Sequence, residues 1–163
     1  MNTRMKILIA SATITFLSVS CTMEQYSPVQ RAEVISAPNQ SQKALYNKSR
    51  QWFSEYFVSG KSVVDYEDAQ AGTIIGNGFA KIGSDPFGII QYNINYSIRV
   101  DTKDGRLKVT TNVIKHSNTD SQQPTYDVTI VPQSRKDMAN QHISSVIENL
   151  KGYVASRRAS SNW

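Results

Sequence analysis

The densest group of acidic side chains in the chain is Asp65, Glu67 and Asp68. If these residues lie in a strand, Asp65 and Glu67 project from the same face, because alternate residues of a strand share a face. Two such carboxylates can act as a general acid and base or hold a cation. A calcium loop would need acids at regular alternate positions, a central glycine and a distal Glu. Since that register is absent, we interpret the cluster as a solvated strand end and predict no metal site.

Gly76-Asn77-Gly78 looks like the start of a phosphate-binding glycine loop. The third glycine of that fingerprint is missing, and the segment lies within a predicted strand rather than between a strand and a helix. A bend, a bulge or close packing against a helix therefore explains these glycines better than phosphate binding does.

The two histidines, His116 and His142, stand alone in the sequence, because neither has a second histidine or a cysteine three or four residues away. A zinc ion needs three or four convergent ligands. No serine lies in a Gly-x-Ser-x-Gly motif, the sharp turn that exposes a nucleophilic serine. We therefore expect no catalytic residue, no metal and no other cofactor.

Cys21 is the single cysteine of the chain and directly follows a short basic and apolar N-terminus. Arg4 and Lys6 are positive, and residues 7–17 carry no charge. A helix needs about 20 apolar residues to cross a bilayer, so this stretch is too short to do so and fits a secretory signal peptide. Ser18-Val19-Ser20 is an acceptable cleavage site in front of Cys21.

The residues before Cys21 resemble the lipobox of bacterial lipoproteins, in which the cysteine thiol is acylated and the upstream peptide is removed. Val19 and Ser20 fit that pattern, whereas Ser18 stands where an aliphatic residue is preferred. The resemblance implies a lipoprotein with fatty acyl chains such as palmitate on Cys21. Thr22 in place of Asp implies the outer membrane rather than the inner one. The alternative is an ordinary signal peptide, cut at the same bond, that releases a soluble periplasmic domain.

The sequence divides into a signal peptide (1–20), a lipidated N-terminus and tether (21–30), one domain (31–158) and a C-terminal tail (159–163). Loss of the signal peptide removes two of the positive charges behind the net charge of +5. No run of Lys and Arg marks a nucleic-acid surface. We therefore expect the membrane and an envelope protein or glycan as partners, and no nucleic acid.

Two segments have the spacing of amphipathic helices. Residues 42–57 follow an expected N-cap at Ser41 and end at Ser59-Gly60. They place an aromatic stripe that includes Trp52 on one side, which indicates core packing rather than a ligand site. The second helix lies near the C-terminus, with Ser134 and Asp137 as its predicted capping box and basic residues at its end.

Between the helices the pattern is that of strands. We predict a weak first strand over 31–36 and four more over 63–66, 73–82, 90–101 and 107–113. Strict alternation of apolar and polar residues over 90–101 indicates one buried and one solvated face. Asp104-Gly105 is typical of a tight hairpin turn. The polar stretch over 116–124 is predicted to be a mobile loop.

The resulting order is strand, helix, four antiparallel strands, helix. Two amphipathic helices and one half-buried sheet satisfy each other only if both helices cover the same sheet face. We therefore predict an α+β two-layer sandwich. Its opposite sheet face is our candidate binding face, whose amides suit neutral polar partners: Gln91, Asn93, Asn95, Arg99, Lys108, Thr110 and Asn112.

One set of motifs spans the first helix and the next two strands: Tyr46, Trp52, Val64, Asp68, Gly72, Ile74, Gly76 and Gly78. These residues resemble a bacterial family of exported domains of unknown function with a TBP-like fold, over roughly residues 31–155. The resemblance implies the same fold order and no activity. The expected function is therefore that of an envelope lipoprotein with a binding or structural role. The alternative is a hydrolase that acts on envelope polymers.

Overall fold

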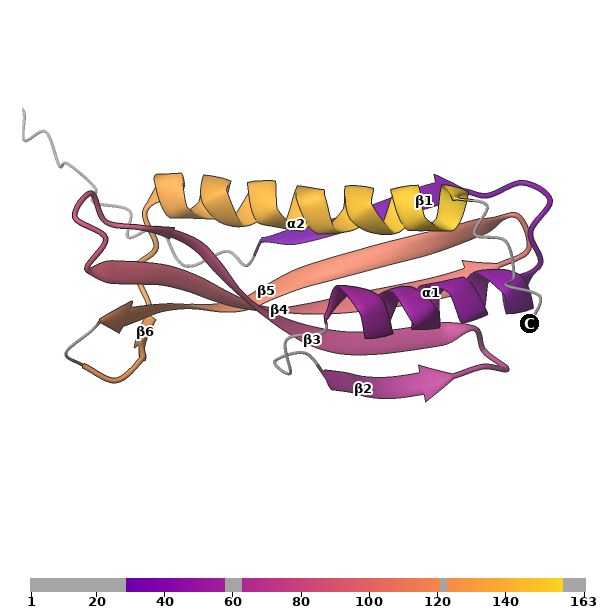
Figure 1. The fold of residues 1–163 in the computed structure, drawn as a ribbon, viewed down its shortest axis with the longest axis horizontal. Helices are drawn as coiled ribbons and strands as arrows, with labels where there is room; N and C mark the ends of the chain where they lie inside the picture. Colours follow the sequence, from indigo (N-terminus) through magenta and orange to yellow (C-terminus); the bar gives the residue numbers. More distant parts are fainter. Residues whose placement is uncertain (1–28, 58–62, 121–122, 157–163) are drawn as a thin grey trace, which may run out of the picture.

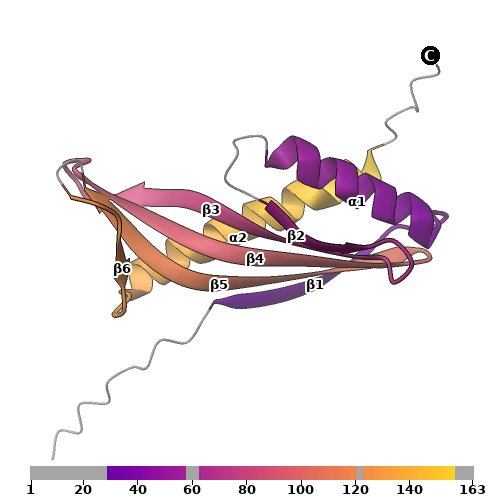
Figure 2. The same ribbon diagram turned by 90° about the horizontal axis from the view of Figure 1, so that it is seen from below.

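The computed structural model describes residues 29–57, 63–120 and 123–156 (Figure 1). Six strands form one antiparallel sheet, and two helices lie together over one of its faces (Figures 1 and 2). The predicted α+β two-layer sandwich is confirmed. In chain order the elements are β1 (Gln30–Ser36), α1 (Gln42–Tyr56), β2 (Val63–Asp68), β3 (Thr73–Ser84), β4 (Ile90–Lys103), β5 (Arg106–Asp120), β6 (Tyr126–Val128) and α2 (Gln133–Ala155).

The strands β2 to β5 follow one another as a meander, and β1 closes the sheet on the far side of β5. The order across the sheet is β1-β5-β4-β3-β2, and β6 also pairs with β5. In β1, Gln30 lies opposite Asn112 and Ser36 lies opposite Arg106. The chain therefore enters β1 level with the middle of its neighbour β5 and runs toward the β4–β5 hairpin. In that hairpin Gly105 adopts a φ of +74°.

The hydrophobic core lies between the sheet and the helices. Alternate residues of the two long central strands, such as Ile94 and Ile98, are fully buried, as the sequence pattern predicts. Burial of each such side chain contributes about 1.5–3 kcal/mol. The helices supply the other half of this core: Leu45, Trp52 and Phe53 from α1, and Ile143, Val146, Ile147 and Leu150 from α2.

The aromatic stripe of α1 belongs to this core, which confirms the packing interpretation. Trp52 stacks on Tyr56 with ring centroids 5.0 Å apart and meets Phe53 edge to face at 5.1 Å. The helix begins as predicted, because Ser41 Oγ accepts a hydrogen bond from the backbone N–H of Ala44 at 3.3 Å. The expected helix end at Ser59-Gly60 lies outside the described residues.

Gly78 of β3 allows close packing between neighbouring strands. A Cβ atom on Gly78 would lie 2.3 Å from the ring of Tyr96, which stands opposite it on β4. The side of Gly78 is thus filled by an aromatic ring from the neighbouring strand, not by a helix. Gly72 ends the β2–β3 turn with a φ of +72°, a conformation that glycine adopts without strain.

The loop predicted over 116–124 is wrong in its first half. β5 continues to Asp120, and His116, Ser117 and Asn118 are buried. The reason is tertiary, because the unpredicted strand β6 pairs with these three residues and Arg135 of α2 donates a hydrogen bond to Asn118 Oδ1 at 2.9 Å. A bulge that pairs Asn95 with Lys115 and Tyr96 with Val113 precedes this extension.

The start of α2 also differs from the prediction. The helix begins at Gln133 after Pro132, and no side chain caps it. Pro132 has a φ of −59°, so its ring orients the entry of the chain without a capping box. Asp137 instead accepts a hydrogen bond from the side chain of Gln133 at 2.9 Å.

The predicted signal peptide, Cys21, most of the predicted tether, the basic residues Arg157 and Arg158 and the predicted C-terminal tail lie outside the described residues. Within the part of the chain that the structure describes, neither helix has the length and apolar character needed to cross a bilayer.

Candidate binding face

The sheet face opposite the helices is open, and the outward residues of four strands form rows across it. Arg99 on β4 stands beside Ile75 on β3 and Thr110 on β5. The next row toward the hairpin contains Asp101 and Lys108. Lys108 in turn stands beside Val34 on β1. This arrangement places most of the predicted binding residues on one surface.

The predicted residues differ in how accessible they are. Gln91, Arg99 and Lys108 are exposed, whereas Asn95, Thr110 and Asn112 are half-buried. Asn93 is only 2 % exposed, so its assignment to an accessible binding face is wrong. Its amide donates to Thr119 Oγ1 at 3.0 Å, because the unpredicted extension of β5 brings Thr119 alongside β4.

Arg99 and Asp101 form an ion pair on this face, with Nε and Oδ2 2.8 Å apart. Thr73 Oγ1 also donates to Asp101, at 2.8 Å. Burial alone would raise the pKa of the Asp101 carboxyl, but the hydrogen bonds from Arg99 and Thr73 and the charges of Arg99 and Lys108 outweigh it. The pKa is therefore lowered, and Asp101 is ionised at neutral pH.

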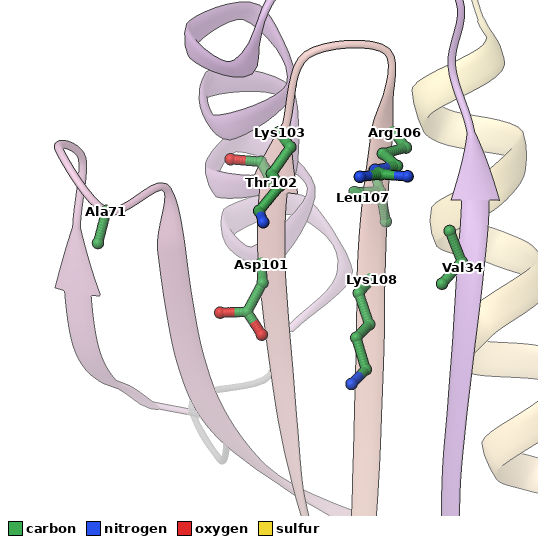
Figure 3. Close-up of a pocket in the computed structure, with 8 residues that line it drawn as sticks. All are labelled: Val34, Ala71, Asp101, Thr102, Lys103, Arg106, Leu107 and Lys108. Atoms are coloured by element: carbon green, nitrogen blue, oxygen red, sulfur yellow. The ribbon is translucent and has the colours of Figure 1, made fainter.

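A hollow of about 420 Å³ lies at the hairpin end of the open face (Figure 3). In Figure 3 the helices lie behind the sheet, so the labelled side chains are seen from the open side. Three strands, β1, β4 and β5, and the β2–β3 turn contribute to it through Val34, Ala71, Asp101, Thr102, Lys103, Arg106, Leu107 and Lys108. Of the predicted binding residues, only Lys108 lines this hollow.

The charged groups around the hollow are mostly cationic. Lys103 and Arg106 make no ion pair or side-chain hydrogen bond within residues 29–57, 63–120 and 123–156. The carboxylate of Asp101 is already bound by Arg99. The hollow therefore offers cations, with Val34 as an apolar wall, to a ligand that carries a negative group. Three basic residues, Lys103, Arg106 and Lys108, lie close together around the Asp104-Gly105 turn in the sequence. This cluster is the sequence signal that could have located the hollow.

The acidic cluster is divided by the structure. A register shift between Val64 and Tyr66 breaks the alternation of β2, so the prediction that Asp65 and Glu67 share a face is wrong. Glu67 bonds Arg50 of α1 at 2.8 Å, and this hydrogen bond lowers the pKa of its carboxyl. Asp65 accepts a hydrogen bond from Asn77 instead.

The third acid, Asp68, stabilises the β2–β3 turn through hydrogen bonds to the backbone. Its carboxylate accepts hydrogen bonds from the backbone N–H groups of Ala71 and Gln70, each at 2.9 Å. The bond from Ala71 has the largest lowering effect on the Asp68 pKa. No group of three or more His, Cys, Asp or Glu side chains able to hold a metal ion occurs among the described residues.

The two histidines lie apart on the helix side of the sheet. His142 Nε2 is 3.5 Å from the hydroxyl of Tyr96, and burial lowers the pKa of His142. His116 stands opposite Ile94, and its pKa is lowered first by burial and then by the charges of Arg135 and Lys136. Both rings therefore belong to the packed layer and not to the open face.

The fold and this face define an α+β domain whose antiparallel sheet has one helix-covered side and one open side. Residues 32–117 match the family described as a domain of unknown function (DUF4468) with TBP-like fold, and the chain belongs to that family. No curated protein matches the chain.

Two solved structures are similar to this chain in fold. One is a DUF4468 family protein from Bacteroides ovatus, with 17 % identity, a TM-score of 0.61, and coverage of 78 % of this chain and 86 % of that one. The other is a TBP-like protein from Parabacteroides distasonis, with 12 % identity, a TM-score of 0.60, and coverage of 78 % and 92 %. At these identities the likeness concerns the fold alone.

Proposed function

We propose that this protein is an outer-membrane lipoprotein, anchored through Cys21, that acts as a non-enzymatic binding module. The observation that carries the binding role is the cationic hollow on the open sheet face. Lys103 and Arg106 stand at its edge without an ion-pair partner among the described residues. A surface of this kind contributes little to folding, whereas it offers charge and hydrogen-bond donors to a ligand.

The chemistry of the hollow favours an envelope protein that presents an acidic group. A Lys or Arg side chain binds a carboxylate more strongly than a neutral acceptor, because both partners are charged. The volume of about 420 Å³ lies within the range of roughly 300–1,000 Å³ typical of ligand pockets. It is large enough for an acidic side chain and its neighbours, while Val34 supplies apolar contact.

The anchor rests on the position of Cys21 behind the signal peptide. Each buried CH₂ group of a lipid contributes about 0.8 kcal/mol of membrane affinity, so a diacylglycerol with a further acyl chain holds a protein stably at the bilayer. An intact-mass spectrum of the protein purified from its native membrane tests this directly. The expected result is a diacylglycerol increment on Cys21. A bare Cys21 would contradict the anchor and leave a soluble periplasmic ligand-binding domain.

Photocrosslinking in the cell tests the binding role. The photoreactive residue p-benzoylphenylalanine replaces Val34 at the hollow or, as the matched control, Lys43, which is exposed on α1. We expect a discrete protein adduct from position 34 and none from position 43.

The charge requirement is tested in the same experiment. The adduct from position 34 should be lost with Lys103→Glu and Arg106→Glu combined, and kept with Lys103→Arg and Arg106→Lys. An adduct that survives charge reversal, or a glycan in its place, would count against an acidic protein partner. The absence of any adduct would contradict binding at the hollow.

A further inference from the structure

The end of the sheet remote from the hollow carries the two most exposed large apolar side chains in the described part of the chain. Phe87 in the β3–β4 turn is 85 % exposed, and Ile130 in the loop between β6 and α2 is 84 % exposed. Ile89, in the same turn as Phe87, is 54 % exposed. Exposed apolar groups gathered at one end of a domain mark a site of interaction with a protein or a membrane.

The two segments belong to the same end of the molecule (Figures 1 and 2). Ile90 and Asp120 form the last pair between β4 and β5, so the β3–β4 turn projects beyond the sheet. The loop that carries Ile130 leads into Arg135, whose guanidinium lies 3.7 Å from the ring centroid of Tyr92 on β4. Tyr92 is two residues after Ile90, the first residue of β4, and so lies at this end of the sheet.

The β3–β4 turn is held in place by its own hydrogen bonds. The Asp85 carboxylate accepts from the backbone N–H of Ile90 at 2.8 Å, and the Asp85 backbone N–H donates to the Ile90 carbonyl at 3.0 Å. Gly88 completes the turn with a φ of +73°. The hydrogen-bonded turn therefore holds Phe87 in its exposed position.

The direction of β1 relates this end to Cys21. The Val29 carbonyl accepts a hydrogen bond from the Val113 N–H at 2.9 Å, so the described chain enters the sheet at that level. It then runs away from Phe87 toward the β4–β5 hairpin. The described chain therefore begins at the end of β1 that faces the exposed apolar end of the sheet.

The length of the tether fits this end. Eight residues from Cys21 to Val29 reach at most about 26–29 Å when fully extended. Along β5, the seven residues from Val113 to Asp120 cover about 23 Å. A lipid on Cys21 can therefore reach the level of the Ile90–Asp120 pair, at the base of the β3–β4 turn, without any reversal of the chain. Contact through the opposite end would require the tether to turn back along β1.

We propose that the β3–β4 turn and the β6–α2 loop form a membrane-contact surface. Phe87, Ile89 and Ile130 enter the interface of the bilayer that holds the Cys21 lipid. This inference rests on the proposed anchor. It orients the domain end-on, with the cationic hollow at the end remote from the membrane. Aromatic and aliphatic side chains at the headgroup boundary bury their apolar area while the backbone of the turn stays hydrated.

Photocrosslinking to lipid tests this orientation. In the full chain, p-benzoylphenylalanine replaces Phe87, Ile130 or, as the control, Val34, and membranes are washed with high salt, irradiated and analysed by mass spectrometry. We expect phospholipid adducts at positions 87 and 130 and none at position 34. The variants should melt at the wild-type temperature, because Phe87 and Ile130 are solvent-exposed.

The outcomes separate the anchor from the orientation. Release of the wild-type chain by the salt wash would overturn the anchor and this inference together. Retention without a lipid adduct at position 87 would overturn the inference alone. A lipid adduct at position 34 in place of position 87 would show that the hollow faces the bilayer, and a protein adduct at position 87 would show that the apolar end binds a protein instead.

Discussion

The indole Nε1 of Trp52 donates a hydrogen bond of 2.8 Å to Oδ1 of Asn149 and so joins the two helices above the sheet. Trp52 is 1 % exposed and belongs to the hydrophobic core between the helices and the sheet. The residue thus supplies both buried apolar area and a direct polar link between elements far apart in the sequence.

Replacement of Trp52 by Ala should therefore lower the free energy of unfolding by about 3–5 kcal/mol, since it leaves a cavity in the core. Trp52→Phe keeps part of the packing but removes the bond to Asn149, so its loss should be smaller. Urea unfolding followed by circular dichroism measures both. An unchanged midpoint for Trp52→Ala would contradict the position of this side chain in the core.

Gly78→Ala should destabilise the domain by about 1–3 kcal/mol, the range for overpacking a core. The added Cβ would lie 2.3 Å from the Tyr96 ring, which is buried and has little room to move. Gly152→Ala is the matched control, because its Cβ meets nothing within 4 Å and it lies in a helix. The control should gain up to about 1 kcal/mol. Equal effects of the two substitutions would refute the close contact.

The stability contributed by Asp101 should depend on pH. Its pKa is lower in the folded chain than the usual value of about 3.9. The carboxylate therefore stabilises the fold above that value and loses this contribution as the pH falls through the folded pKa. The difference in unfolding free energy between wild type and Asp101→Asn should be largest near neutral pH and vanish in acid. A difference that is constant from pH 7 to pH 2 would contradict this.

Cys21→Ser should move the protein from the membrane fraction to the soluble fraction, because the thiol that takes the lipid is gone. Fractionation of cells and immunoblotting measure the change. The same substitution should leave the melting temperature of the domain unaltered. If the Ser variant stays fully bound to the membrane after a high-salt wash, the lipid anchor is wrong.

The main elements of the fold could be predicted because their side-chain periodicity records which face each one buries. Ile94 and Ile98 alternate with polar residues and lie at the core, and the Asp104-Gly105 turn joins β4 to β5 as expected. The aromatic stripe around Trp52 has helical spacing and packs as a helix face. These signals are local, so a single sequence contains them in full.

The candidate site was less predictable. Alternation along β4 places Asn93 on the open face, but the extended β5 brings Thr119 against it and buries it. The strand signal for Asp65 and Glu67 assumes an unbroken ladder, and the bulge after Val64 separates them. Lys103 and Arg106 form part of a hollow only because the hairpin and β1 meet there.

The sequence by itself determined the two helices, the long central strands, the tight hairpin turn and the layered α+β class, because apolar periodicity and turn chemistry act over a few residues. The tertiary structure decided where β5 ends, that β6 exists, which acids separate and where the hollow lies. Those features depend on backbone pairing and burial between segments remote in the chain. Their polar residues, such as His116 to Asn118, carry no local pattern that distinguishes a buried strand from a solvated loop.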